Sequence, residues 1–123
     1  VQSVAATGAA ATAGGGSLLE AAVKFKIGKC HLALKEWRAA LAELETIPAR
    51  SRSLPITLAL ARTYRRAGYE RAAIACYKEC LRISPFALEA VTALTQLGVQ
   101  GGDLRAALPP AARRAAEAAE VAT

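Results

Sequence analysis

The sequence of 123 residues has one histidine, His31, no methionine and few aromatic residues. The sequence also shows no Ser/His/Asp set with a recognisable nucleophile turn. The run Gly14-Gly15-Gly16 is not followed by the Lys-Ser/Thr pair of a phosphate-binding loop. We therefore predict no catalytic residue and no cofactor. The missing initiator methionine indicates a fragment, so an enzyme carrying this region as an annex stays open only through catalytic motifs in flanking sequence.

Long apolar runs are also absent, and the cysteines are few. No run approaches the roughly 18 apolar residues of a membrane span, so none is predicted. Cys76 and Cys80 are four positions apart on one predicted helix face, and Cys30 adjoins His31. Zinc sites normally show four ligands in paired short spacings, held by loops or tight turns. We predict three buried free thiols, no metal, and a reducing, intracellular compartment.

A repeated pattern of residue sizes is what the sequence does contain. The stretch Lys24 to Ile47 recurs over Thr57 to Cys80, and a third copy begins at Val91. This spacing is close to the roughly 34-residue period of tetratricopeptide (TPR) arrays. The aligned pairs are Ile27 with Leu60, Gly28 with Ala61, His31 with Tyr64, Ala40 with Ala73, Leu41 with Ile74, Leu44 with Tyr77, and Ile47 with Cys80.

Small residues in this pattern allow two antiparallel helices to approach closely, and the large ones fill the space between hairpins. We predict an all-α fold, a TPR helical-hairpin solenoid with about two repeats plus one further helix. Trp37 is expected in its core.

Turn and cap residues predict the boundaries. A Gly/Ala-rich flexible linker is expected at 1–17, with Ser17 and Glu20 forming a capping box at the first helix. The TPR array covers 18–100, with hairpins at about 18–47 and 54–84 and a further helix at about 86–98. Pro48, Pro55, Gly68 and Pro85 mark its internal helix ends. An irregular Gly/Pro segment and an Ala-rich terminal helix are expected at 101–123.

Positive charge is unevenly distributed, within a formal net charge of +6. Six arginines fall in one stretch that holds a single acid, Glu70. They are Arg50, Arg52, Arg62, Arg65, Arg66 and Arg71. By repeat position, Lys29, Arg62, Arg65 and Arg66 are expected to line the inner groove of the array, where an acidic peptide or a neighbouring subunit could lie. The alternative is a solvated face that keeps the protein soluble.

Two kinds of ligand are not favoured by this basic stretch. It lacks the interleaved stacking aromatics of single-strand binders, so nucleic acid is not predicted. TPRs that bind a C-terminal carboxylate have polar residues at a set of clamp positions. Lys29 occupies one of them, but the preceding clamp position holds Phe25, which argues against that clamp.

Three stretches go beyond a generic repeat. They are VKFKIGKCHLAL at 23–34, IPARSR at 47–52, and the run 60–90 with RAGYER, YKECLR and SPFALEA. Together they resemble the seventh-subunit family of the anaphase-promoting complex, near its N-terminal repeats. The resemblance covers about residues 20–101 and ends after about Gly102, where Leu108-Pro109-Pro110 replaces the expected continuing helix.

The resemblance implies a non-catalytic scaffold of a multisubunit ubiquitin ligase that controls mitosis. It also implies homodimerisation of the full-length family member, stacking on other TPR subunits of the complex, and residence in nucleus and cytoplasm. The alternative is an unrelated TPR adaptor that binds an acidic peptide in its basic groove. Neither reading involves a membrane.

Overall fold

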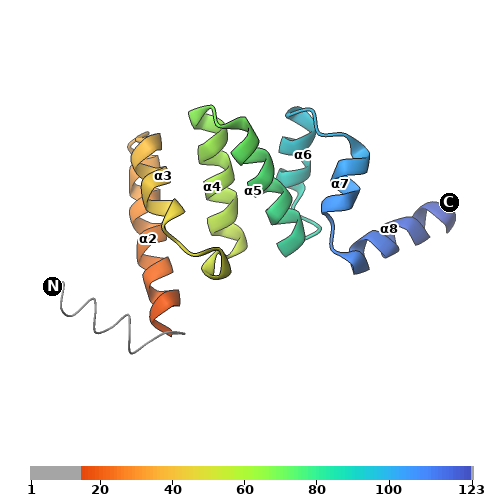
Figure 1. Cartoon of the computed structure of the whole chain (residues 1–123), viewed down its shortest axis with the longest axis horizontal. Helices are drawn as coiled ribbons and strands as arrows, with labels where there is room; N and C mark the ends of the chain where they lie inside the picture. Colours follow the sequence, from red (N-terminus) through yellow and green to blue (C-terminus); the bar gives the residue numbers. More distant parts are fainter. Residues whose placement is uncertain (1–14, 123) are drawn as a thin grey trace. The chain divides into compact units, whose positions relative to one another are not determined.

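The computed structural model describes residues 15–122, and in this range helices joined by turns are the only regular secondary structure, with no β-strand (Figure 1). The α-helices are α2 (Gly15–Ala33), α3 (Trp37–Glu45), α4 (Leu54–Ala67), α5 (Glu70–Ile83), α6 (Leu88–Gln96), α7 (Gly101–Ala107) and α8 (Pro110–Ala122), with a short 3-10 helix, η1 (Ala49–Ser51). The predicted all-α class is confirmed. The chain divides into two compact units: unit 1 ends at Arg52, and unit 2 begins at Ser53.

Unit 1 is an antiparallel hairpin of α2 and α3, and η1 packs against α2 (Figure 1). Its two helices approach closely because Gly28 on α2 faces Leu44 on α3. A Cβ at position 28 would lie 2.7 Å from Cδ2 and 2.9 Å from Cγ of Leu44. Ala40, Leu44 and Ile47 are fully buried beside this contact. Small residues therefore set the helix spacing here, as the repeat pattern predicts.

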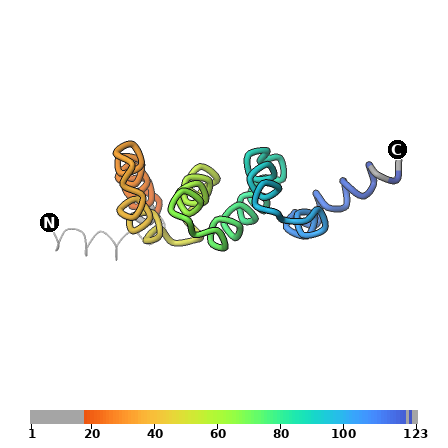
Figure 2. The backbone as a smooth tube through the Cα atoms, turned by 90° about the horizontal axis from the view of Figure 1, so that it is seen from above, coloured from red at the N-terminus to blue at the C-terminus, as the bar shows by residue number. Residues whose placement is uncertain are grey.

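Unit 2 builds on a second hairpin, α4 and α5. Helix α6 packs against α5, and α7 packs against both α5 and α6, in the order seen from above in Figure 2. The buried residues that form the core between these helices are Ala61, Ala73, Tyr77, Cys80, Leu81, Ala90, Ala93, Leu94 and Ala107. Alanine predominates among them, so the helices of unit 2 also meet at short side chains.

A glycine ends α4 and starts the turn into α5. Gly68 has a φ of +89°, in the left-handed region that glycine adopts without a Cβ penalty. Its N–H donates to the carbonyl of Arg65 at 3.2 Å, and the N–H of Tyr69 donates to that of Tyr64 at 2.9 Å. These two bonds define a Schellman cap, which satisfies carbonyls left open at a helix C-terminus.

The same cap recurs in unit 1 with a lysine in place of glycine. Lys35 has a φ of +60°. Its N–H donates to the carbonyl of Leu32 at 3.0 Å, and the backbone N–H of Glu36 donates to the backbone carbonyl of His31 at 2.9 Å. Left-handed backbone costs a residue with a Cβ roughly 1–2 kcal/mol, so this turn is strained where the α4–α5 turn is not.

A third cap, at the end of α6, corrects the expected repeat number. Gly98 has a φ of +87°, its N–H donates to the carbonyl of Thr95 at 3.0 Å, and the N–H of Val99 donates to that of Leu94 at 3.0 Å. Helix α6 is thus the first half of a short third hairpin that α7 completes. The Gly/Pro segment expected to be irregular is helical at 101–107, because α7 buries Ala107 against the core of unit 2.

The first helix begins earlier than predicted. Helix α2 already includes Gly15 and Ser17, so Ser17 is not the helix cap that the capping box requires. The predicted linker otherwise falls on residues 1–14, which lie outside the described residues. Helix α8 lies in the region where an Ala-rich terminal helix was expected.

Burial departs from the repeat alignment at several positions. Ile27 is 40% exposed, whereas its counterpart Leu60 is 1% exposed. Trp37 is only half-buried. Of the three cysteines predicted to be buried, Cys80 is buried, Cys76 is half-buried and Cys30 is exposed. Burial, reinforced by the neighbouring Cys76, raises the pKa of the Cys80 thiol to about 12, so this cysteine stays a neutral packing residue at physiological pH.

Gly28→Ala should destabilise unit 1. The added methyl group collides with a fully buried Leu44, and overpacking typically costs about 1–3 kcal/mol, which outweighs the roughly 1 kcal/mol of helix propensity gained. Thermal unfolding followed by circular dichroism measures the effect. Gly102→Ala in α7 is the matched control, because nothing lies within 4 Å of its added Cβ; this variant should be neutral or more stable. Equal melting temperatures for Gly28→Ala and the parent would contradict the close approach.

Lys35→Gly should stabilise the α2–α3 turn by up to about 1 kcal/mol, because glycine removes the left-handed strain and loses only part of that gain to unfolded-state entropy. Urea unfolding of the two proteins measures the difference. The reverse exchange, Gly68→Lys, should destabilise the α4–α5 turn. A less stable Lys35→Gly protein would show that the lysine side chain contributes more than the strain costs.

Candidate protein-binding hollow

Three arginines of α4 line an open hollow of about 350 Å³ in unit 2, together with Tyr77 of α5. Arg62, Arg65 and Arg66 stand three and four positions apart, the spacing that places helical residues on one face. Helix α6, the next helix against α5, supplies acceptors to two of them. Arg62 and Arg65 therefore connect the first helices of two successive hairpins, α4 and α6, which are the helices expected to line an inner groove.

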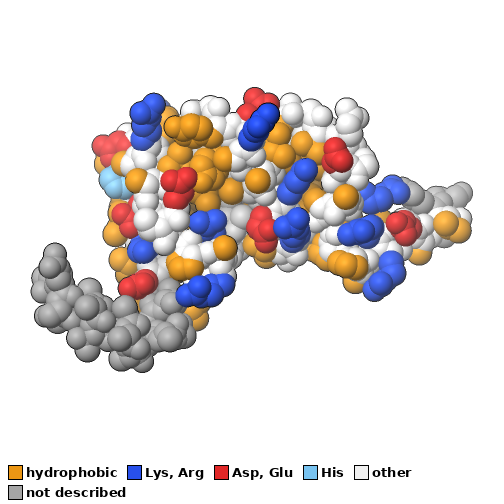
Figure 3. Space-filling view, viewed as in Figure 1, with side chains coloured by type: hydrophobic (Ala, Val, Ile, Leu, Met, Phe, Trp, Pro, Cys, Tyr) orange, Lys and Arg blue, Asp and Glu red, His pale blue; other side chains and the backbone are white. Residues whose placement is uncertain are grey.

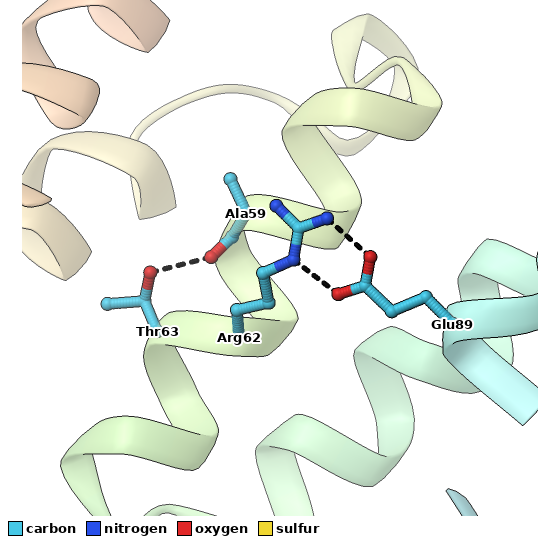
Figure 4. A network of polar contacts seen from close by, with 4 residues as sticks. All are labelled: Ala59, Arg62, Thr63 and Glu89. Carbon is cyan, nitrogen blue, oxygen red and sulfur yellow. Dashed lines mark hydrogen bonds and ion pairs between the residues drawn. The ribbon is translucent and has the colours of Figure 1, made fainter. Parts of the chain in front are cut away.

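Arg62 forms a two-bonded ion pair with Glu89 of α6, in which Nε and one terminal nitrogen each donate to a carboxylate oxygen (Figure 4). The hydrogen bond to Arg62 lowers the pKa of the Glu89 carboxyl, and the same bond raises the pKa of the Arg62 guanidinium. Both side chains are largely exposed, at 53% for Arg62 and 42% for Glu89. Because water screens such a pair, it contributes little to stability.

Arg65 donates to the side-chain carbonyl of Gln96 at 3.0 Å, and Gln96 lies about two helical turns along α6 from Glu89. Tyr77 lies beneath this row and is only 2% exposed. Burial, followed by the Glu89 charge, raises the pKa of the Tyr77 phenol, and the nearby Arg65 and Arg62 oppose this shift. The hollow thus has guanidinium groups at its wall and a neutral hydroxyl at its base.

A buried threonine on another side of α4 needs no ligand. Thr63 is buried, and its hydroxyl donates to the carbonyl of Ala59 at 2.6 Å (Figure 4). The bond satisfies the only polar atom of the side chain within the helix itself. Thr63 is therefore a packing residue.

Three of the four predicted groove residues line one hollow in unit 2, and the fourth, Lys29, belongs to unit 1. In unit 1, Lys29 has its Nζ 5.1 Å from the centre of the Phe25 ring, a cation–π distance. It is not among the residues that line the hollow of unit 2. The acceptors Glu89 and Gln96 were missed by sequence reasoning; their seven-residue spacing, two turns along one face of α6, is the signal that could have found them.

Another arginine of the basic stretch has a structural role. Arg52 donates through Nε to the carbonyl of Ile47 at 2.9 Å and through a terminal nitrogen to that of Glu45 at 3.3 Å. These bonds occupy carbonyls at the end of α3. On the face shown in Figure 3, basic and acidic side chains alternate over α4 to α6, so the surface there is not one continuous positive patch.

Other candidate chemistry finds little support in the part of the chain that the structure describes. No group of three His, Cys, Asp or Glu side chains there could hold a metal ion. His31 lies at the α2–α3 turn, with Nδ1 2.7 Å from a carboxylate oxygen of Glu36. None of the described helices has both the length and the apolar character needed to cross a bilayer.

These features define the class: the described chain is a TPR-like helical-repeat protein, in which recurring caps join the two helices of each hairpin and three arginines line a hollow in unit 2. No protein-family model matches the sequence. The chain is homologous to curated proteins named Anaphase-promoting complex subunit 7, as its resemblance to that family predicts.

The homologues come from distant organisms. The Arabidopsis thaliana protein is 44% identical over 95 residues, which is 77% of this chain and 17% of the plant protein. The human protein is 41% identical over 85 residues, covering 69% of this chain and 15% of its own length. The Dictyostelium discoideum protein is 36% identical over 78 residues, covering 62% and 13%. The chain thus spans less than a fifth of each of these relatives.

The Arg62–Glu89 pair should lose its coupling in acid. A carboxyl whose folded pKa is depressed below its ordinary 4.5 stabilises the fold above the unfolded pKa, and this contribution disappears as pH falls through the folded value. A double-mutant cycle of Arg62→Met and Glu89→Gln at pH 7 should give at most about 1 kcal/mol, and the same cycle below the folded pKa should give none. A coupling energy that stays constant across this range would contradict the ion pair.

Proposed function

We propose that this chain is part of a non-catalytic scaffold subunit of the anaphase-promoting complex, a multisubunit ubiquitin ligase that controls mitosis. The observation that carries the proposal is 44% identity, over 77% of the chain, to a plant protein named as a subunit of that complex. The human relative with the same name supports it independently. This homology favours the scaffold over an unrelated TPR adaptor.

Helical hairpins suit a scaffold, because a scaffold acts only through surfaces that contact other proteins. Helical repeats bury one set of faces against their neighbours and leave others for partner proteins. Exposed apolar side chains are present in both units, and the largest exposures are those of Leu18, Leu19, Leu34, Phe86, Leu88 and Val121. Apolar groups left in water are typical of protein contacts. Other TPR subunits of the complex are the partners proposed for these faces.

The finer assignments follow from the proposal. Full-length members of the family form homodimers, and we extend that property to the protein that carries this sequence. Neither nucleic acid nor a membrane is a proposed partner. The proposed location is nucleus and cytoplasm, where the complex acts, and the reducing environment suits three free cysteines.

Affinity purification tests the scaffold role. The protein carrying this sequence is tagged at its own locus and purified from dividing cells, and co-purifying proteins are quantified by mass spectrometry. We expect the cullin, RING and other TPR subunits of the complex in near-stoichiometric amounts. A parallel purification of a tagged, unrelated TPR protein controls for unspecific capture. Recovery of acidic clients without any subunit of the complex would overturn the proposal.

A further inference from the structure

We infer that the hollow lined by Arg62, Arg65, Arg66 and Tyr77 binds an acidic segment of another protein, whose carboxylate takes the place on Arg62 that Glu89 now holds. The inference goes beyond the scaffold role. It rests on unit 2 alone and applies whichever assembly contains the chain. Glu89 is then an internal competitor for the site.

The Glu89 contact itself identifies the ligand chemistry. Two parallel N–H···O bonds from one guanidinium to one carboxylate are the geometry by which arginine selects carboxylates (Figure 4). A glutamate or aspartate of a bound segment can form the same two bonds. Arg62 therefore already presents its fork in the orientation that an acidic ligand requires.

Glu89 can be displaced because little holds it in place. Its side chain is 42% exposed, and Arg62 is the one partner of its carboxylate among the hydrogen bonds of the described residues. Exposed ion pairs exchange with water and with other ions at small cost. An incoming carboxylate can thus replace Glu89 without opening the core of unit 2.

Glu89 leaves the charge of Arg65 without a counter-charge, because the acceptor on Arg65 is the neutral amide of Gln96. Arg65 lines the hollow beside Arg62. The Tyr77 hydroxyl can donate to an acceptor at the base. A segment with two consecutive acidic residues would therefore match the site better than one carboxylate does.

Nucleic acid fits the hollow less well. Single strands bind basic grooves by stacking their bases on exposed aromatic rings. The one aromatic residue that lines this hollow, Tyr77, is 2% exposed, so its ring offers no free face. The site provides charge and hydrogen-bond donors but no stacking platform, which favours a carboxylate-rich peptide.

Fluorescence anisotropy of a labelled decaglutamate peptide with the full chain tests the inference. Glu89→Gln should bind about two- to fivefold more tightly than the parent, because it removes the competing carboxylate. Glu79→Gln is the matched control, since it makes the same charge change and also frees an arginine, Arg82, from its partner at 3.0 Å. This control should bind as the parent does.

Charge reversal tests the arginine row. Arg62→Glu with Arg65→Glu should abolish binding while helicity by circular dichroism is retained. Arg71→Glu with Arg82→Glu makes the same net change on exposed positions of α5 and should keep most of the affinity. If the first double variant is unfolded, Arg66→Glu, with at least a tenfold loss expected, replaces it.

Each contrary result overturns a stated part of the inference. If neither the parent nor Glu89→Gln binds the peptide, the hollow is not a binding site for acidic segments. If Glu89→Gln and Glu79→Gln increase the affinity for the peptide equally, Glu89 is not a competitor for the site. If the two double variants lose affinity equally, overall charge and not the arginine row determines binding. Tighter binding of a ten-nucleotide oligothymidylate would assign the hollow to nucleic acid. None of these results bears on the co-purification test of the scaffold role.

Discussion

The close approach of paired helices at small side chains is the constraint on which the rest of this structure depends. Gly28 lets α2 meet Leu44 of α3. In the second hairpin, fully buried Ala61 of α4 takes the place of Gly28, and fully buried Ala73 of α5 takes that of Ala40. Because cores tolerate neither voids nor extra atoms, these positions fix the helix spacing in each hairpin. That spacing, repeated from α5 to α6, brings Glu89 within reach of Arg62.

Much of the fold could be predicted from the sequence, because it is encoded locally. The size pattern identified the hairpins, and Gly68 marked the end of α4 through its need for a positive φ. The short third hairpin could not be predicted, since Gly101 and Gly102 disfavour a helix and only packing of α7 on α5 and α6 stabilises it. Lys35 also gave no signal, because a residue with a Cβ rarely adopts the left-handed conformation that it has here.

The site was predicted in part. Helical spacing was enough to gather three arginines of α4, but a count of charges does not show what each arginine contacts. Arg52 holds carbonyls at the end of α3, and Arg62 pairs with a glutamate 27 positions away in the chain. Such pairing is a property of neighbouring repeats, which explains why a basic stretch of sequence becomes a mixed surface in the fold. The role proposed for the hollow depends on an exposed arginine whose carboxylate partner, Glu89, can be exchanged.

The proposed role makes the chain a set of contact surfaces within a large assembly, and homology to proteins named Anaphase-promoting complex subunit 7 supports this role. Cross-linking mass spectrometry on the purified complex tests it most directly, through exposed lysines of α2 and its turn, Lys26, Lys29 and Lys35. The account predicts cross-links from these lysines to other TPR subunits of the same complex. Lysines that react fully with the reagent, yet form no link to any other subunit, would contradict it.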